Sequence, residues 1–101
     1  MFIYNITIKV NNSIEEEWMA WQMEEHVPGI MATNLFDKFK IFRLLEQDDS
    51  EGQTFVFQYY TEHRKNYEQY INEHASRLRE KAVKKWGDAF IAFRSLLEAV
   101  Q

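Results

Sequence analysis

This sequence contains no cysteine, a single proline and only three glycines among its 101 residues. Without cysteine the chain can form neither a disulfide nor a thiolate metal site, and it has no cysteine nucleophile. We find no internal repeat, linker or low-complexity segment. A chain of this length fits one modest core, so we expect residues 1–101 to form a single domain.

Long apolar runs are also missing. No stretch approaches the roughly 18 consecutive apolar residues that a membrane-spanning helix needs, so no membrane partner is expected. Residues 1–10 alternate in polarity and lack a basic leader followed by an apolar block, which favours a strand over a signal peptide. A cytoplasmic location fits these features.

Acidic residues outnumber basic ones and give a formal net charge of −4. Because phosphate neutralisation needs clustered Lys and Arg, a nucleic-acid partner is not expected. One basic cluster does occur, and it comprises Arg77, Arg79, Lys81, Lys84 and Lys85. Glu73 and Glu80 flank or interrupt this cluster, which favours a solvated helix face over an anion-binding role.

Apolar side chains (46 %) and aromatic side chains (16 %) are abundant, which indicates a folded, soluble domain. The clearest pattern is an alternation near the N-terminus, which predicts a strand over residues 2–10. One face of this strand is fully apolar and consists of Phe2, Tyr4, Ile6, Ile8 and Val10.

A helix is predicted to follow and to begin at Ser13, which can form a capping box with Glu16. Its apolar stripe at helical spacing contains Ile14, Trp18 and Trp21. Because Pro28 disfavours helical geometry at the residue before it, the helix is expected to end near His26. A turn or a short extra helix should come next.

Two strands are predicted over residues 36–47 and 54–61, joined as an antiparallel hairpin by the acidic, glycine-ended loop 48–52. The first strand has apolar residues at both parities, so its facing stays open. The second alternates clearly, and its apolar face consists of Phe55, Phe57 and Tyr59.

A second helix is predicted over residues 62–86, with Gly87 as its C-cap and with a break or bend left open at 72–76. The last strand is predicted over residues 90–100. The order β-α-β-β-α-β defines an α+β, ferredoxin-like fold, in which a four-stranded antiparallel sheet has two helices on one face.

Two helices leave the other face of such a sheet uncovered. We predict that this open face carries Ile3, Asn5, Thr7, Val56, Gln58, Tyr60, Phe90, Arg94 and Leu96. Such a face is too apolar for water and too polar for an ordinary core. A second copy packed sheet on sheet is the economical cover, which predicts a homodimer that encloses a cavity lined by mixed side chains.

Several runs carry a resemblance to known proteins: Trp18, Glu25-His26-Val27-Pro28, Ala32-Thr33 and Phe90-Ile91-Ala92-Phe93-Arg94-Ser95-Leu96-Leu97-Glu98. With the predicted plan, they resemble a small family of bacterial proteins of about this length that is known only as a domain of unknown function. More distantly, the chain is similar to the dimeric α+β barrel superfamily. That superfamily includes cofactor-free monooxygenases, isomerases, lyases, haem-degrading enzymes and ligand-sensing domains, so the resemblance implies a fold and selects no function.

Five residues are candidates for ligand binding, namely Asn5, His26, Gln58, Tyr60 and Arg94. His26 is also a weak candidate for catalysis, as a general base or hydrogen-bond donor at the barrel mouth, because the ordinary histidine pKa lies near neutrality. Alternatively, His26 is simply a histidine that the helix dipole favours near a helix C-terminus.

The other candidates have structural alternatives. Arg94 could bind a carboxylate of a ligand, or it could form an ion pair with Glu98 or across the dimer. Asn5, Gln58 and Tyr60 could orient a ligand or bond across the dimer interface. The two tryptophans of the first helix are expected to be core residues. The three histidines share no ligand spacing, so neither a metal nor another cofactor is expected.

Two functions therefore stay open. The favoured one is a homodimeric protein that binds or senses a small molecule, or that has no ligand and uses the mixed sheet face mainly as a dimer interface. The alternative is a cofactor-free enzyme of monooxygenase or isomerase type that uses His26 with Asn5, Gln58 or Arg94, although no specific catalytic constellation supports it.

Overall fold

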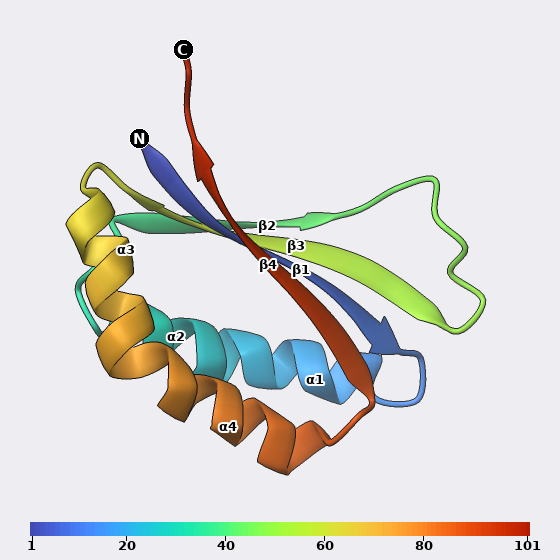
Figure 1. Ribbon diagram of the computed structural model, residues 1–101. Coiled ribbons are helices and arrows are strands. Elements are labelled where there is room, and N and C mark those ends of the chain that lie inside the picture. Colours follow the sequence, from blue (N-terminus) through green and yellow to red (C-terminus); the bar gives the residue numbers. More distant parts are fainter.

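A computed structural model describes residues 1–101 as a four-stranded antiparallel sheet with all of its helices on one side (Figure 1). The elements in chain order are β1 (Phe2–Asn11), α1 (Glu15–Trp21), η1 (Gln22–His26), α2 (Val27–Met31), β2 (Lys38–Arg43), β3 (Gly52–Thr61), α3 (Arg64–Tyr70), η2 (Ile71–Ala75), α4 (Ser76–Trp86) and β4 (Phe90–Glu98). The π-helical turns η1 and η2 join their flanking helices into two continuous helical segments. This architecture confirms the predicted α+β, ferredoxin-like fold.

The sheet has the order β2-β3-β1-β4, which puts β1 and β3 at its centre. The register pairs Tyr4 with Tyr59, Ile6 with Phe57 and Ile8 with Phe55. Directly paired residues share one face of a sheet, and these residues are all buried beneath the helices. The predicted apolar faces of these two strands are therefore confirmed.

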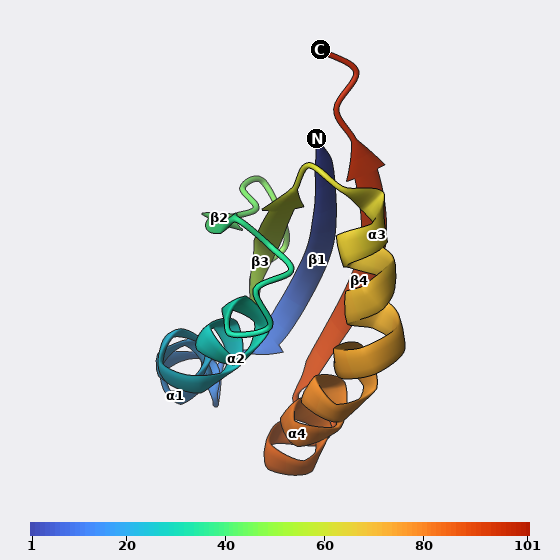
Figure 2. The same cartoon turned by 90° about the vertical axis from the view of Figure 1, so that its left-hand side faces the viewer.

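The core lies between this sheet face and the two helical segments, which Figure 2 shows on the same side of the sheet. Its buried members come from every layer: Tyr4, Ile6, Ile8, Val10, Trp18, Val27, Ile30, Leu35, Phe36, Phe55, Phe57, Tyr59, Tyr70, Ala75 and Leu78. Trp18 is fully buried and packs its ring against those of Phe55 and Phe57, with centroids 6.0 and 5.8 Å away.

No helix is both long enough and apolar enough to cross a membrane.

The first helical segment begins differently from the prediction. The capping box is wrong, because the backbone N–H and the hydroxyl of Ser13 both donate to Asn11 Oδ1 at 2.8 Å. This local turn ties up the serine, and α1 begins at Glu15 with no side-chain cap.

The first helical segment also ends later than predicted, because it continues through η1 and α2 as far as Met31. Pro28 lies in the first turn of α2, where its missing N–H costs little, and the wider π turn just before it absorbs the change of register. His26 therefore lies inside a continuous helical segment and not at a helix C-terminus. The dipole explanation for His26 does not apply.

The second helical segment follows the prediction more closely. The break left open at residues 72–76 is the π turn η2. Gly87 ends the segment with φ at +60°, and its N–H donates to the carbonyl of Val83 at 2.8 Å, as a C-cap should. The hairpin is also confirmed, although β2 is shorter than predicted, and pairing with β3 turns Phe39 and Ile41 toward the helices.

The predicted facing of β4 is wrong. The register pairs Phe90 with Val10, Arg94 with Ile6 and Leu96 with Tyr4, so these β4 residues face the helices. The open face instead receives Ile91, Phe93, Ser95 and Leu97. Because β4 has apolar residues at both parities, its own sequence contains no cue, and a change of one residue in register reverses every side chain.

Candidate functional site

The five candidate residues divide between the two sides of the sheet. Asn5, Gln58 and Tyr60 lie on the open face, as predicted. His26 and Arg94 lie on the helix side, the first on η1 and the second on β4. The fold thus brings together two separate groups.

On the open face, the polar residues form a chain of hydrogen bonds. The hydroxyl of Tyr60 donates to Gln58 Oε1 at 2.5 Å, and Gln58 Nε2 donates to Asn5 Oδ1 at 3.0 Å. Asn5 Nδ2 donates in turn to Thr7 Oγ1 at 3.4 Å. These side chains satisfy one another, so the chain can be covered by another surface without leaving its main donors unpaired.

Exposed apolar residues surround this polar chain. Phe93 and Ile91 of β4 are 69 % and 59 % exposed, and Phe42 of β2 is 45 % exposed. The strand pairing puts Phe93 opposite Thr7 and Phe42 opposite Val56, on the same face as the polar chain. Large apolar side chains therefore stand in water on both sides of the polar chain.

On the helix side, His26 is half-buried and stacks on Trp21, with ring centroids 4.9 Å apart. Trp21 Nε1 donates to Glu25 Oε2 at 2.8 Å, and the Trp21 ring meets Trp86 of α4 edge to face at 6.0 Å. Glu25 is exposed to solvent, and its carboxylate accepts this bond from Trp21. The two tryptophans predicted as core residues are indeed buried.

Burial lowers the pKa of His26, and with the smaller effects of the positive charges of Arg94 and Lys81 it falls to about 4. The imidazole is therefore neutral at pH 7. A general base works best when its pKa lies near the working pH, so His26 in this environment accepts protons weakly.

A groove lies between the two helical segments, and one of its lining residues is Trp21, on which His26 stacks. Its volume is about 460 Å³, and it is lined by Trp21, Glu25, Lys81, Lys84 and Lys85. A second hollow of about 310 Å³ shares Trp21, Glu25 and Lys85 with it and adds Trp86. We call these two adjoining hollows the helix groove.

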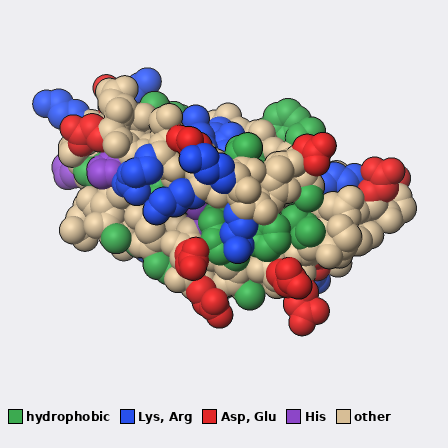
Figure 3. Space-filling view, turned by 90° about the horizontal axis from the view of Figure 1, so that it is seen from below, with side chains coloured by type: hydrophobic (Ala, Val, Ile, Leu, Met, Phe, Trp, Pro, Cys, Tyr) green, Lys and Arg blue, Asp and Glu red, His purple; other side chains and the backbone are tan.

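The two helical segments touch on either side of this region. The Trp21–Trp86 contact marks one end, and at the other Gly29 approaches α4 so closely that an added Cβ would lie 3.4 Å from Leu78. Figure 3 views the molecule from the helix side and shows Lys and Arg side chains gathered over one region and acidic ones along the opposite margin, with hydrophobic side chains between.

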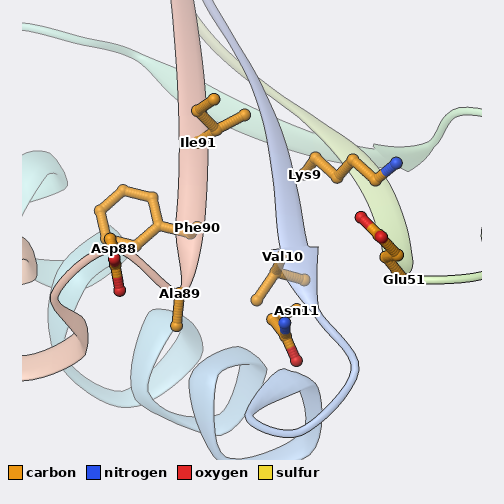
Figure 4. A pocket seen from close by; sticks show the side chains of 8 residues that line it. All are labelled: Lys9, Val10, Asn11, Glu51, Asp88, Ala89, Phe90 and Ile91. Carbon is orange, nitrogen blue, oxygen red and sulfur yellow. The ribbon is translucent and has the colours of Figure 1, made fainter.

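A third hollow lies away from the candidate residues. It has a volume of about 210 Å³ and lies where β1 and β4 meet the neighbouring loops (Figure 4). Its lining residues are Lys9, Val10, Asn11, Glu51, Asp88, Ala89, Phe90 and Ile91. Figure 4 shows the two carboxylates on opposite sides, so they do not converge on one ligand. No group of three or more His, Asp or Glu side chains could hold a metal ion.

Two residues on the helix side, Gln22 and Lys81, were not among the candidates predicted from the sequence. Gln22 is only 3 % exposed, and its side chain makes no hydrogen bond within the protein. Lys81 of α4 acts on His26, although the basic cluster to which it belongs was interpreted as solvated. A signal existed for Gln22, since residues four apart share a helix face and Gln22 precedes His26 by that spacing.

These features define the class of protein: a ferredoxin-like α+β domain with one covered and one open sheet face. The model of the family described as Domain of unknown function (DUF4286) matches residues 1–100. The chain belongs to this family, which confirms the resemblance seen in the sequence. No curated protein matches the chain in sequence.

Solved structures share the fold at low sequence identity. A dimeric ferredoxin-like protein from an uncultured marine organism is 17 % identical with a TM-score of 0.72, covering 99 % of this chain and 95 % of its own. A protein from Bacillus halodurans described as an ethyl tert-butyl ether d (ethd) family protein is 14 % identical with a TM-score of 0.67. The match covers 99 % of this chain and 100 % of that protein. SnoaB, a cofactor-independent oxygenase from Streptomyces nogalater, is 10 % identical with a TM-score of 0.67, covering 99 % and 94 %.

Proposed function

We propose that this protein is a homodimer that binds a small molecule, with the two copies packed through the open faces of their sheets. The observation that carries the proposal is the open face itself, where Phe93, Ile91 and Phe42 are exposed beside a polar chain that is already hydrogen-bonded. Large exposed apolar side chains on both sides of a satisfied polar chain are typical of an interaction site. Two fold neighbours are described as dimeric ferredoxin-like proteins, which supports a second copy as the partner.

In this proposal the candidate residues have different roles. Asn5, Gln58 and Tyr60 serve the dimer interface, where their mutual hydrogen bonds reduce the cost of burying polar groups. His26 and Arg94 serve the ligand, which binds in the helix groove of each protomer. The volume of the groove is within the range of small-molecule sites. A cytoplasmic location, expected from the sequence, stays part of the proposal.

Sedimentation velocity tests the homodimer. The unmodified protein should sediment as a dimer at micromolar concentration, and Phe93→Glu should raise the dissociation constant by about 100-fold or more, because it would bury an unpaired charge. Val83→Glu is the matched control, since Val83 is also apolar and 56 % exposed but lies on α4, on the other side of the sheet. A monomeric unmodified protein, or equal effects of the two variants, would contradict the proposed dimer.

Ligand binding is tested by a thermal-shift screen of hydroxylated aromatics and small acids, because a ligand that binds only the native state raises the melting temperature. A hit should lose its effect when Trp21, which lines both hollows, is replaced by Ala. Its effect should persist in Val83→Glu. Shifts that survive the Trp21 replacement would count against the helix groove as the site.

A cofactor-free enzyme of monooxygenase or isomerase type is the second candidate function. The observation that favours it is the neutral imidazole of His26, which can accept a proton and which stacks on Trp21, a lining residue of the helix groove. The low pKa of that imidazole weakens this candidate, and binding without turnover is therefore preferred. Oxygen consumption or isomerised product with any hit of the thermal-shift screen would reverse that preference.

A further inference from the structure

The helix groove carries positive charge that the protein does not neutralise. Among the lysines that line it, Lys84 pairs with Glu80 at 3.1 Å, whereas Lys81 and Lys85 form no ion pair. Arg94, which is not one of the residues that line the groove, also forms none, and the alternative pairing with Glu98 does not occur. In a protein with a net charge of −4, unpaired cations gathered on one groove are a local exception.

Two of these cations come from different elements and act on one position. Lys81 belongs to α4 and Arg94 to β4, and the charges of both are felt at the ring of His26. Because His26 is half-buried, water screens this positive potential less than it would on an open surface. An anion bound beside His26 would therefore be attracted by both.

The acidic side chains of the groove leave this attraction in place. Glu25 lines the same hollow and stays charged when it accepts a hydrogen bond from the indole N–H of Trp21, but three lysines line this hollow against that one carboxylate. Glu17 and Glu24 line only the adjoining hollow, the one that Lys81 does not reach. The lysines that line the groove thus belong to α4, and its acidic residues belong to the first helical segment.

Neutral groups next to these cations suit an organic ligand. Trp21 and Trp86 offer aromatic surface in the two adjoining hollows. A ligand that carries both a flat apolar body and a negative group would use all of these contacts.

We propose that the helix groove binds a small aromatic carboxylate, with its acidic group near Lys81 and Arg94 and its ring against Trp21. This inference rests on the proposed small-molecule function and adds the chemical class of the ligand. It differs from the sequence-based interpretation of the α4 basic cluster, because that interpretation could not include a cation from β4 or the opposing tryptophan.

Titration by nuclear magnetic resonance, with millimolar benzoate as the probe, tests the ligand class. Benzoate should shift the indole N–H of Trp21 and the ring signals of His26, and benzamide, its neutral isostere, should bind at least about fivefold more weakly. Bound benzoate should also raise the pKa of His26, whose charged neighbours are Lys81, Arg94 and the adjacent Glu25.

Charge-removing variants locate the anion. Lys81→Gln and Arg94→Gln should each raise the dissociation constant for benzoate about threefold to tenfold. Lys65→Gln, an exposed lysine on α3, is the matched control and should leave it unchanged. Because none of these residues lies on the open face, sedimentation should still report a dimer in every variant.

The possible outcomes separate the inference from the function on which it rests. Equal affinity for benzamide and benzoate at the groove would overturn the anion class and would leave the small-molecule function standing. Equal affinity for inorganic phosphate and for benzoate would overturn the proposal that the ligand is aromatic. If neither aromatic compound shifts the Trp21 signal and the thermal-shift screen finds no hit, the small-molecule function itself fails.

Discussion

The two faces of one sheet differ sharply in what covers them. On the helix side, Tyr4 of β1 and Tyr59 of β3 are 2 % and 1 % exposed, whereas on the open side Phe93 of β4 is 69 % exposed. Three of the four strands, β2, β3 and β4, contribute aromatic residues to both faces. Apolar content alone therefore does not identify a core, because apolar side chains can also remain exposed as a binding surface for a partner.

The two faces also differ in how they treat polar groups. The open face ties Asn5, Gln58 and Tyr60 into a chain of hydrogen bonds, so little polar capacity remains unused. The helix side leaves Lys81 and Arg94 unpaired around a neutral histidine. A surface with satisfied polar groups suits burial against protein, and a groove with unsatisfied charges suits a ligand of opposite charge.

The largest test of this comparison is Trp18→Ala on the helix side. Trp18 is fully buried against Phe55 and Phe57, so the free energy of unfolding should fall by about 3–5 kcal/mol. Urea unfolding at one fixed protein concentration measures this fall. Met23→Ala, at a residue 46 % exposed on the same helical segment, should change stability by less than about 0.5 kcal/mol.

A smaller effect is expected from the pH dependence of the helix side. His26 has a pKa of about 4 in the folded protein, below the ordinary value of 6.5, so the unfolded chain binds the proton more readily. The stability contributed by the neutral imidazole is complete above pH 6.5 and is lost as the pH falls through 6.5 toward 4. The loss should amount to about 2–3 kcal/mol.

The measurement is the free energy of unfolding at intervals from pH 7 to pH 4 in the unmodified protein and in His26→Gln. The variant should lose this component, and its curve should be flatter over that window. His63→Gln, at an exposed histidine outside the groove, should retain the full dependence. Equal slopes for all three proteins would show that His26 is not held neutral by its surroundings.

The smallest expected effect belongs to the open face. Gln58→Leu removes the middle of the polar chain and leaves Asn5 and Tyr60 without their partner. If this face is buried in a dimer, the dissociation constant should rise by about fivefold to 30-fold, since an unpaired buried group costs about 1–2 kcal/mol. Tyr60→Phe, which removes only the terminal donor, should weaken the dimer less. An unchanged dissociation constant in Gln58→Leu would put this chain outside the interface.

Much of the fold could be predicted because its signals are local. The alternation in β1 and β3, the acidic hairpin loop and Gly87 each act over a few residues, and the structure has all of them. The prediction failed where two local signals competed. Ser13 bonds to Asn11 in place of capping the helix, and the π turn η1 carries the helix past the position where Pro28 alone would end it.

The candidate site was predictable in part. Asn5, Gln58 and Tyr60 could be grouped because each lies on a strand whose facing its own alternation reveals. His26 and Arg94 were chosen for their chemistry, but they were expected near the face that holds the other three. Their actual neighbours, Lys81 and Gln22, depend on how the two helical segments lie against each other, and no single segment contains that information.

By itself the sequence determined the order of elements, the hairpin and the buried sides of the central strands, because hydrophobic periodicity acts within each segment. The facing of β4 depends on the tertiary structure. Its apolar residues occur at both parities, so only its pairing with β1 determines which of them face the helices. The tertiary structure also decided that a lysine of α4 and an arginine of β4 act on one histidine of η1. Such groupings arise from packing between segments that are far apart in the chain, and sequence patterns within one segment do not predict that packing.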